Sequence, residues 1–150
     1  MMYISIKVRA EVKKTEDLDK VLFAISNLIT FDKNDVKVKE EGERIIIQIE
    51  TKNINALEPL HNLIRQDRVI DAVAKALKRN RVGNITTLYL NREAAYMKHI
   101  NLYSPDSDLF QPIEIVIASE NLDKILDWLV PPTKEGKPLF ELKIDDLKNS

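Results

Sequence analysis

Residues 3–12 read Tyr-Ile-Ser-Ile-Lys-Val-Arg-Ala-Glu-Val. Apolar side chains occupy every second position from Ile4 to Val12, and polar side chains such as Lys7 and Arg9 fall between them. This period of two is typical of a β-strand with one face in the core and the other toward water. Such half-buried strands belong to antiparallel sheets that are covered on one side only. The stretch therefore predicts the layout of the whole fold.

The residues that follow predict a helix and then a hairpin. Thr15 can cap a helix N-terminus, and the apolar residues of 18–29 recur at helical spacing. The alternation of the first strand returns at 36–39 and 45–49, on either side of Glu40-Glu41-Gly42-Glu43. Two alternating runs around a glycine-containing turn indicate a β-hairpin.

The rest of the chain repeats these two patterns. We expect strands at 85–90 and 113–118, and helices over 55–64, 69–80, 92–98 and 119–129. Phe140, Leu142 and Ile144 alternate once more and predict an edge strand within a tail at 139–150. Together these elements predict an α+β fold, a mostly antiparallel sheet with helices packed on one face, forming a single domain over residues 1–150.

The amino-acid composition excludes several kinds of functional site. The 150 residues contain no cysteine, which excludes disulfides, thiolate nucleophiles and iron–sulfur clusters. The longest apolar run, 21–25, is far too short to cross a bilayer, and the first residues form no secretory signal. We therefore expect a cytoplasmic protein with no membrane partner.

The residues that catalysis needs are scarce. His61 and His99 are the only histidines, and their positions on or at the end of predicted helices favour structural roles over metal binding. Three glycines cannot build a phosphate-binding loop or a dinucleotide fingerprint. No nucleophile elbow is present. We expect no catalytic residues, no metal site and no cofactor, and hence no enzyme.

Charge is distributed unevenly along the chain, although the formal net charge is only −1. Residues 65–98 carry eight basic and three acidic residues, a net charge of +5, whereas the remainder carries −6. On the helix predicted over 69–80, the basic residues fall opposite the apolar ones. A concentrated basic face is typical of proteins that bind phosphate backbones. The alternative is the wet face of an amphipathic helix, with cations favoured near its C-terminus.

Two weaker features accompany this face. The loop 131–138 is stiffened by prolines and contains Lys134 and Lys137, which could reach a phosphate. Tyr89, Tyr96 and Tyr103 could stack on unpaired bases if they are exposed. Trp128 lies among apolar residues at helical spacing, so we expect it in the core.

Three stretches together resemble a known family. They are Val8-Arg9-Ala10-Glu11-Val12 with Thr15-Glu16-Asp17, then Gly83-Asn84 with Leu90-Asn91-Arg92-Glu93-Ala94-Ala95, and finally Asp127-Trp128-Leu129-Val130-Pro131-Pro132-Thr133-Lys134-Glu135-Gly136-Lys137-Pro138. In order and spacing the sequence is similar to an archaeal family of uncharacterised proteins described as predicted RNA-binding domains. The resemblance implies a fold like that of the large-subunit ribosomal protein that binds 5S ribosomal RNA. Glu93 departs from the family pattern, where a neutral amide is expected.

Two functions remain open from the sequence. One is a non-catalytic RNA-binding protein that contacts phosphates through a basic helix and loop. Its candidate RNA-binding residues are Arg68, Lys75, Lys78, Arg79, Arg81, Arg92, Lys134 and Lys137. The other is a protein-interaction or structural module that forms a homodimer through its sheet. One contiguous basic face would favour RNA, and an apolar open sheet face would favour a protein partner.

Overall fold

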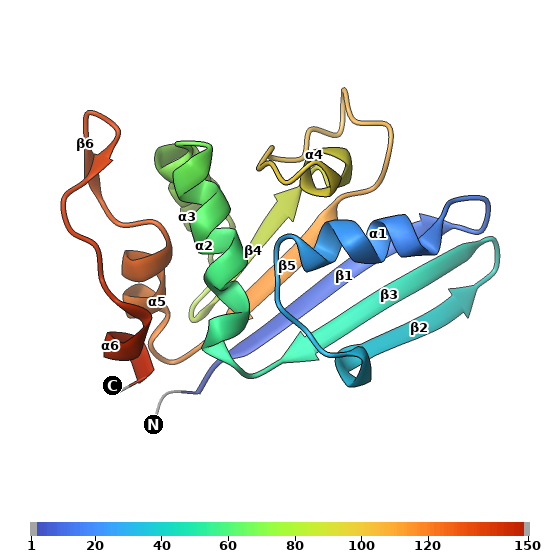
Figure 1. Cartoon of the computed structure of the whole chain (residues 1–150), viewed down its shortest axis with the longest axis horizontal. Helices are drawn as coiled ribbons and strands as arrows, with labels where there is room; N and C mark the ends of the chain where they lie inside the picture. Colours follow the sequence, from blue (N-terminus) through green and yellow to red (C-terminus); the bar gives the residue numbers. More distant parts are fainter. Residues whose placement is uncertain (1–2, 149–150) are drawn as a thin grey trace.

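The computed structural model of the protein describes residues 3–148. Its centre is a five-stranded sheet in the order β2-β3-β1-β5-β4, in which every neighbouring pair is antiparallel (Figure 1). The strands are β1 (Ser5–Lys13), β2 (Val36–Glu41), β3 (Arg44–Thr51), β4 (Ile85–Leu90) and β5 (Ile113–Ala118). The predicted α+β class and the antiparallel sheet are confirmed.

The alternating stretch forms the middle strand of this sheet. In β1, Ile6, Val8 and Ala10 are buried, while Lys7 and Arg9 are exposed on the opposite face. The period of two thus separates a core face from an open face, as the sequence predicts. Because β1 pairs with β3 on one side and β5 on the other, its polar side chains lie in the middle of the open face.

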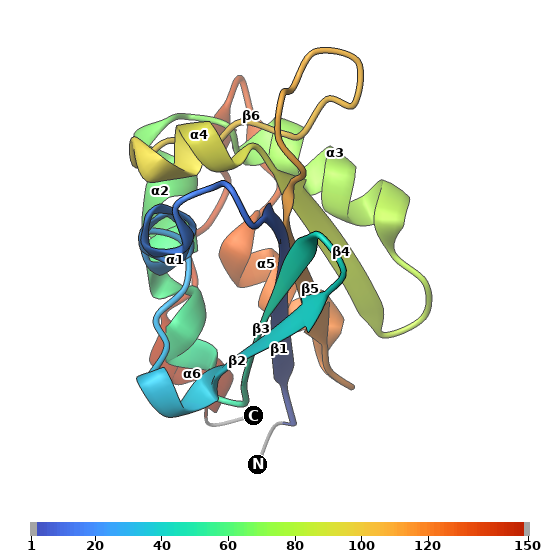
Figure 2. The ribbon, with the colours of Figure 1, turned by 90° about the vertical axis from the view of Figure 1, so that its right-hand side faces the viewer.

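The helices cover the apolar face of the sheet. Figures 1 and 2 show α1, α2 and α4 along one side of the strands, with α3 beside β4. The helices are α1 (Leu18–Ser26), α2 (Glu58–Gln66), α3 (Ile70–Asn80), α4 (Arg92–Tyr96), α5 (Leu122–Leu129) and α6 (Ile144–Lys148), with short 3₁₀ turns η1 (Lys33–Asp35) and η2 (Ile54–Leu57). Their buried side chains form one apolar core with β1, β3, β4 and β5.

Two helix starts differ from the sequence prediction. Asp17, not Thr15, caps α1, and its Oδ1 accepts a hydrogen bond of 3.0 Å from the Asp19 N–H. Ser119 does not cap α5, because Asn121 occupies that position. The Ser119 hydroxyl instead donates to the Tyr3 carbonyl oxygen and accepts from the Asn121 N–H. It therefore fastens the end of β5 to the residue that precedes β1.

The junction between α2 and α3 positions the most basic helix. α2 ends at Gln66, and Arg68 adopts a left-handed conformation with φ of 55° that turns the chain into α3. At its other end, α3 is fastened to β4 by a hydrogen bond of 2.9 Å from Asn80 Nδ2 to the Thr87 carbonyl oxygen. α3 therefore runs along the outer edge of the sheet.

The C-terminal segment corrects one prediction. Residues 139–143 form no strand, Ile144–Lys148 form α6, and the last two residues of the predicted tail, 149–150, lie outside the described residues. The physical reason is tertiary. Leu147 is fully buried against the core, and Glu141 forms an ion pair with Arg65 of α2. These contacts hold the segment against helices, away from the two edges of the sheet.

Candidate nucleic-acid interface

The exposed side of α3 is basic because its apolar residues all turn inward. Ile70, Val73 and Leu77 are buried. Lys75, Lys78 and Arg79 lie on the opposite side of the helix and are exposed. Residues three or four apart on a helix share a face, so Lys75 and Lys78 follow one another along the same strip.

A second pair of lysines is held beside the first turn of α3. Strands β6 (Thr133–Lys134) and β7 (Lys137–Pro138) form a two-stranded hairpin in which Lys134 pairs with Lys137. Glu135 and Gly136 form its turn, with φ of 54° and 79°, the positive values that a type I′ turn requires. The hydroxyl of Thr133 donates to the carboxylate of Asp71 in α3. This contact brings the hairpin to the helix.

Six of the eight candidate cations lie on α3, on the turn before it or on the hairpin beside it, and we call this set the basic ridge. It consists of Arg68, Lys75, Lys78, Arg79, Lys134 and Lys137, all exposed. Among residues 3–148, none of these six side chains forms a hydrogen bond or an ion pair. The acids nearby are Asp71, which accepts from Thr133, and Glu135 in the hairpin turn. The ridge therefore presents free positive charge.

Arg81 is engaged within the protein. Its guanidinium pairs with Asp123 in the first turn of α5, and its Nε donates to the Gly83 carbonyl oxygen at 2.8 Å. The side chain is half-buried. It holds the turn between α3 and β4 against the start of α5, and an RNA phosphate would have to compete with Asp123 for it.

Arg92 lies in the interior, with 6% of its surface exposed. Its guanidinium pairs with Glu16, donates to the Glu11 carbonyl oxygen at 2.7 Å and lies 4.8 Å from the centre of the Phe110 ring. Burial lowers the pKa of Arg92 from its usual value, while Glu16 acts in the opposite direction. A guanidinium in this position joins α4 to β1 and to the turn before α1 and is not offered to a ligand, so Arg92 does not belong to the basic ridge.

The three tyrosines have different surroundings. Tyr89 and Tyr96 are each 40% exposed, whereas Tyr103 is half-buried. Tyr89 lies on the open face of the sheet, opposite Glu114 of β5. Tyr96 belongs to α4 and packs edge-to-face on Phe23, with ring centres 5.3 Å apart. Tyr103 lies beside Tyr89, because its N–H donates to the Tyr89 carbonyl oxygen at 2.9 Å, and Tyr89 is the more exposed of these two rings.

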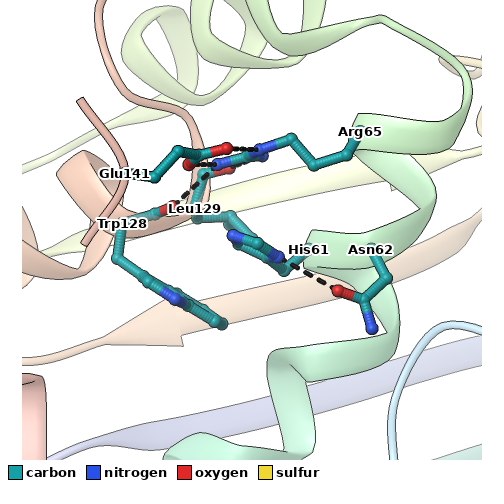
Figure 3. Close-up of polar contacts among 6 residues, drawn as sticks. All are labelled: His61, Asn62, Arg65, Trp128, Leu129 and Glu141. Carbon is teal, nitrogen blue, oxygen red and sulfur yellow. Dashed lines mark hydrogen bonds and ion pairs between the residues drawn. The ribbon is translucent and has the colours of Figure 1, made fainter. Parts of the chain in front are cut away.

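His61 has a structural position. Its ring stacks on Trp128 with centres 4.6 Å apart, and its Nδ1 lies 3.2 Å from Asn62 Oδ1 (Figure 3). Its Nε2 is buried and has no hydrogen-bond partner in the described structure. Burial, the largest effect, lowers the pKa of His61. Trp128 is buried, as predicted.

Arg65 fastens the C-terminal segment beside this stack (Figure 3). It donates to the carbonyl oxygens of Trp128 and Leu129 at 3.0 and 2.8 Å, where α5 ends. It also donates to both carboxylate oxygens of Glu141, at 2.9 and 2.8 Å. These hydrogen bonds lower the pKa of Glu141.

His99 contacts a single carboxylate. Its Nδ1 lies 3.1 Å from Asp67 Oδ1. Burial alone would raise the pKa of Asp67, but hydrogen bonds from the Ile100 N–H and His99 lower it. Within residues 3–148, no three histidine or acidic side chains gather where they could hold a metal ion. No described helix has the length and apolar character needed to cross a membrane.

The sequence did not indicate the partners of Arg65, Arg81 and Arg92. Each pairs with an acid at least 42 positions away in the chain. No local spacing carries that information. The one available signal was the excess of arginines in a segment rich in buried apolar residues.

Comparison with known proteins agrees with this architecture. A family model described as RNA binding matches residues 5–119. A UPF0201 protein of Aeropyrum pernix is 33% identical over 145 residues, which cover 95% of each chain, and one of Sulfurisphaera tokodaii is 34% identical over 89% of this chain and 92% of its own. The crystal structure of a UPF0201 protein from Methanococcus jannaschii superposes with a TM-score of 0.75 at 28% identity, covering 91% of this chain and 99% of that one.

The matches extend over almost all of the described fold. They include β1 to β5, and the Aeropyrum relative covers 95% of the chain. The family model is described by RNA binding and not by a reaction, which agrees with the expectation that the chain is not an enzyme. The likeness to a ribosomal protein stays a prediction. The chain belongs to the archaeal UPF0201 family, and a family model described as RNA binding matches it as well.

Proposed function

We propose that this protein binds RNA without catalysis and that the basic ridge supplies the phosphate contacts. The observation that carries the proposal is the presence of six exposed, unpaired cations on α3, on the turn before it and on the hairpin that Thr133 fastens to it. Arg68 comes from the turn before α3, Lys75, Lys78 and Arg79 come from α3, and the other two come from the hairpin. The description of the family supports the same function.

Unpaired cations favour RNA binding because they can contact a phosphate without first breaking an ion pair. An RNA backbone carries a negative charge at every phosphate, and lysine or arginine side chains that contact it release condensed counterions. A cation that is already paired must first give up its carboxylate. The ridge cations have no such partner, so their full charge is available.

The alternative, a homodimer or another protein complex through the sheet, receives less support. An apolar open face would favour it, but the exposed positions of its central and β2 strands carry Lys7, Arg9, Lys37 and Gln48, and the exposed apolar Ile85 lies at its β4 edge. Protein interfaces are depleted in charged residues at their centres. A homodimer through the sheet is therefore one of the outcomes that the following test distinguishes.

The test compares a ridge variant with a matched control. Lys78→Glu with Arg79→Glu reverses two ridge charges, and Lys13→Glu with Lys20→Glu reverses two exposed lysines, one at the end of β1 and one on α1. Fluorescence anisotropy with a mixed-sequence single-stranded RNA is measured over a series of salt concentrations. For about four neutralised phosphates, the log–log salt slope of the wild type should be about −3.

We expect the ridge variant to bind about tenfold more weakly at low salt and its slope to flatten by about 1.4, because two phosphate contacts are lost. The control should resemble the wild type. Equal losses in both variants would mean that only net charge matters and would contradict the ridge. Failure of the wild type to bind single-stranded or hairpin RNA at low salt would reject RNA binding, and a stable dimer in ultracentrifugation would then favour the interaction module.

A further inference from the structure

A hollow lies in the middle of the open sheet face. It has a volume of about 290 Å³ and crosses β2, β3, β1 and β5. The polar side chains that line it are Lys7, Arg9, Asp35, Lys37, Gln48, Glu50 and Glu114. We call it the sheet hollow. We infer that it receives the bases of an unpaired RNA segment whose phosphates lie on the basic ridge, an inference that rests on the proposed function.

The strand register arranges these side chains in rows. Lys37 pairs with Gln48, Gln48 with Arg9, Arg9 with Glu114 and Glu114 with Tyr89. One row therefore runs across all five strands. Neighbouring strands are about 4.8 Å apart, so the row is about 19 Å long. From β2 to β4 it offers ammonium, amide, guanidinium, carboxylate and phenol groups in a fixed order.

Most of these groups are free to bind a ligand. Among the described residues, Lys7, Lys37, Gln48 and Glu114 form no side-chain hydrogen bond or ion pair. Arg9 makes one contact, of 4.0 Å, with Glu11. An exposed polar side chain whose direction is set by its strand can exchange water for a ligand at small cost in conformational entropy.

The charge of the sheet hollow differs from that of the basic ridge. Lys7, Arg9 and Lys37 are balanced by Asp35, Glu50 and Glu114, all of which line the hollow. A neutral mixture attracts phosphates poorly, because the carboxylates repel them. The same mixture suits base edges, where glutamine bonds adenine, arginine bonds guanine and a carboxylate accepts from the amino group of cytosine.

Tyr89 adds a surface for stacking. It stands at the end of the row on β4, next to Glu114, and 40% of it is exposed. Single-stranded RNA is recognised by stacking unpaired bases on aromatic rings while their edges form hydrogen bonds. The edges of a duplex are already paired, so the sheet hollow should select unpaired RNA.

β4 joins the two surfaces. The end of α3 is fastened to this strand by the hydrogen bond from Asn80 to Thr87, and Tyr89 lies two residues further along the same strand. Because α3 lies beside β4 (Figure 2), a strand of RNA whose phosphates follow α3 can turn its bases across β4 onto the open face. The positive charge of the basic ridge suits the phosphates of the RNA, and the balanced charge of the sheet hollow suits the bases.

The test uses two tyrosines of equal exposure. Tyr89→Leu removes the ring on β4 that ends the row, next to the lining residue Glu114, whereas Tyr96→Leu removes a ring that is also 40% exposed but lies on α4. Each variant is titrated with single-stranded RNA and with a fully paired duplex of the same sequence, and circular dichroism with thermal unfolding checks that it folds. Glu114→Gln, which keeps the size of the side chain, provides a second variant and is titrated with oligocytidine and oligouridine.

We expect Tyr89→Leu to weaken binding of single-stranded RNA about tenfold, to leave duplex binding unchanged and to keep the wild-type salt slope, because stacking carries no charge. Tyr96→Leu should match the wild type. Glu114→Gln should lower the preference for oligocytidine over oligouridine. The inference would be overturned if both Tyr89→Leu and Glu114→Gln bound single-stranded RNA with wild-type affinity. The proposed function would be decided separately, by the salt slope of the ridge variant. A dimer in ultracentrifugation that Tyr89→Leu dissociates would also overturn it, because a second copy would then cover the sheet hollow.

Discussion

The arginines of residues 65–98 divide into two groups that look alike in the sequence. Arg68 and Arg79 are exposed and unpaired on the basic ridge. Arg65, Arg81 and Arg92 each hold an acid from a distant part of the chain. The first group is available to a ligand, and the second group joins elements of the fold. A basic segment is therefore a poor guide to a binding surface until the partners of its cations are known.

The difference has an energetic basis. An arginine that loses water on burial must regain its hydrogen bonds from carboxylates or carbonyl oxygens. Removal of either partner then leaves a charge without compensation. An exposed cation keeps its water and contributes little to folding. Stability and RNA affinity should consequently respond to different arginines.

The largest loss of stability is expected from Arg92→Met. The change leaves Glu16, a largely buried carboxylate, without its cation, so the free energy of unfolding should fall by about 3–5 kcal/mol. Chemical denaturation followed by circular dichroism measures it. Glu16→Gln with Arg92→Met should recover part of the loss. A single variant as stable as the wild type would place Arg92 at the surface and return it to the candidate interface.

A smaller loss is expected from Arg65→Met. Two carbonyl oxygens at the end of α5 and the carboxylate of Glu141 lose their donor, which should cost about 1–3 kcal/mol. Limited proteolysis should then cut within 139–148 sooner than in the wild type. Arg68→Met is the matched control, because Arg68 is exposed and unpaired three residues later. Equal losses in the two variants would contradict the division of the arginines.

The pH dependence of the free energy of unfolding should reflect the lowered pKa of His61, the half-buried ring next to Arg65. Burial lowers the pKa of His61 in the folded protein, so the unfolded chain binds a proton first as the pH falls below about 6.5. The free energy of unfolding should therefore decrease between pH 7 and pH 5. His61→Phe keeps a ring to stack on Trp128 and should reduce this decrease. His99→Gln should leave unchanged the decrease that His61 causes. A wild-type pH profile in His61→Phe would disprove the assignment.

The smallest change in stability is expected on the basic ridge. Lys75→Gln with Lys78→Gln removes two unpaired charges from the exposed side of α3, so the free energy of unfolding should change by less than about 0.5 kcal/mol. The same protein should bind RNA more weakly. A stability loss comparable to that of Arg65→Met would show that these lysines belong to the fold and not to an interface.

Much of the fold follows from local pattern. The alternation at 3–12, 36–49, 85–90 and 113–118 correctly predicted the strands, and helical spacing predicted α1, α2, α3 and α5 within a few residues. These patterns suffice because a sheet with one open face imposes a period of two on each strand. The same logic failed at 139–144, where three alternating apolar residues lie against helices and form no strand. A short alternating pattern does not determine whether the segment lies beside an edge of the sheet in the folded protein.

By itself the sequence determined the α+β class, the antiparallel strands, the buried Trp128 and the basic character of 65–98, because each depends on residues close together in the chain. Only the tertiary structure decided which cations are free. It paired Arg81 with Asp123 and Arg92 with Glu16, and it placed the lysines of the 131–138 hairpin beside α3 through Thr133 and Asp71. The row across the sheet hollow arises in the same way, from the register of strands far apart in the sequence. Charges interact through space over a few ångströms, and the order of residues along the chain does not fix those distances.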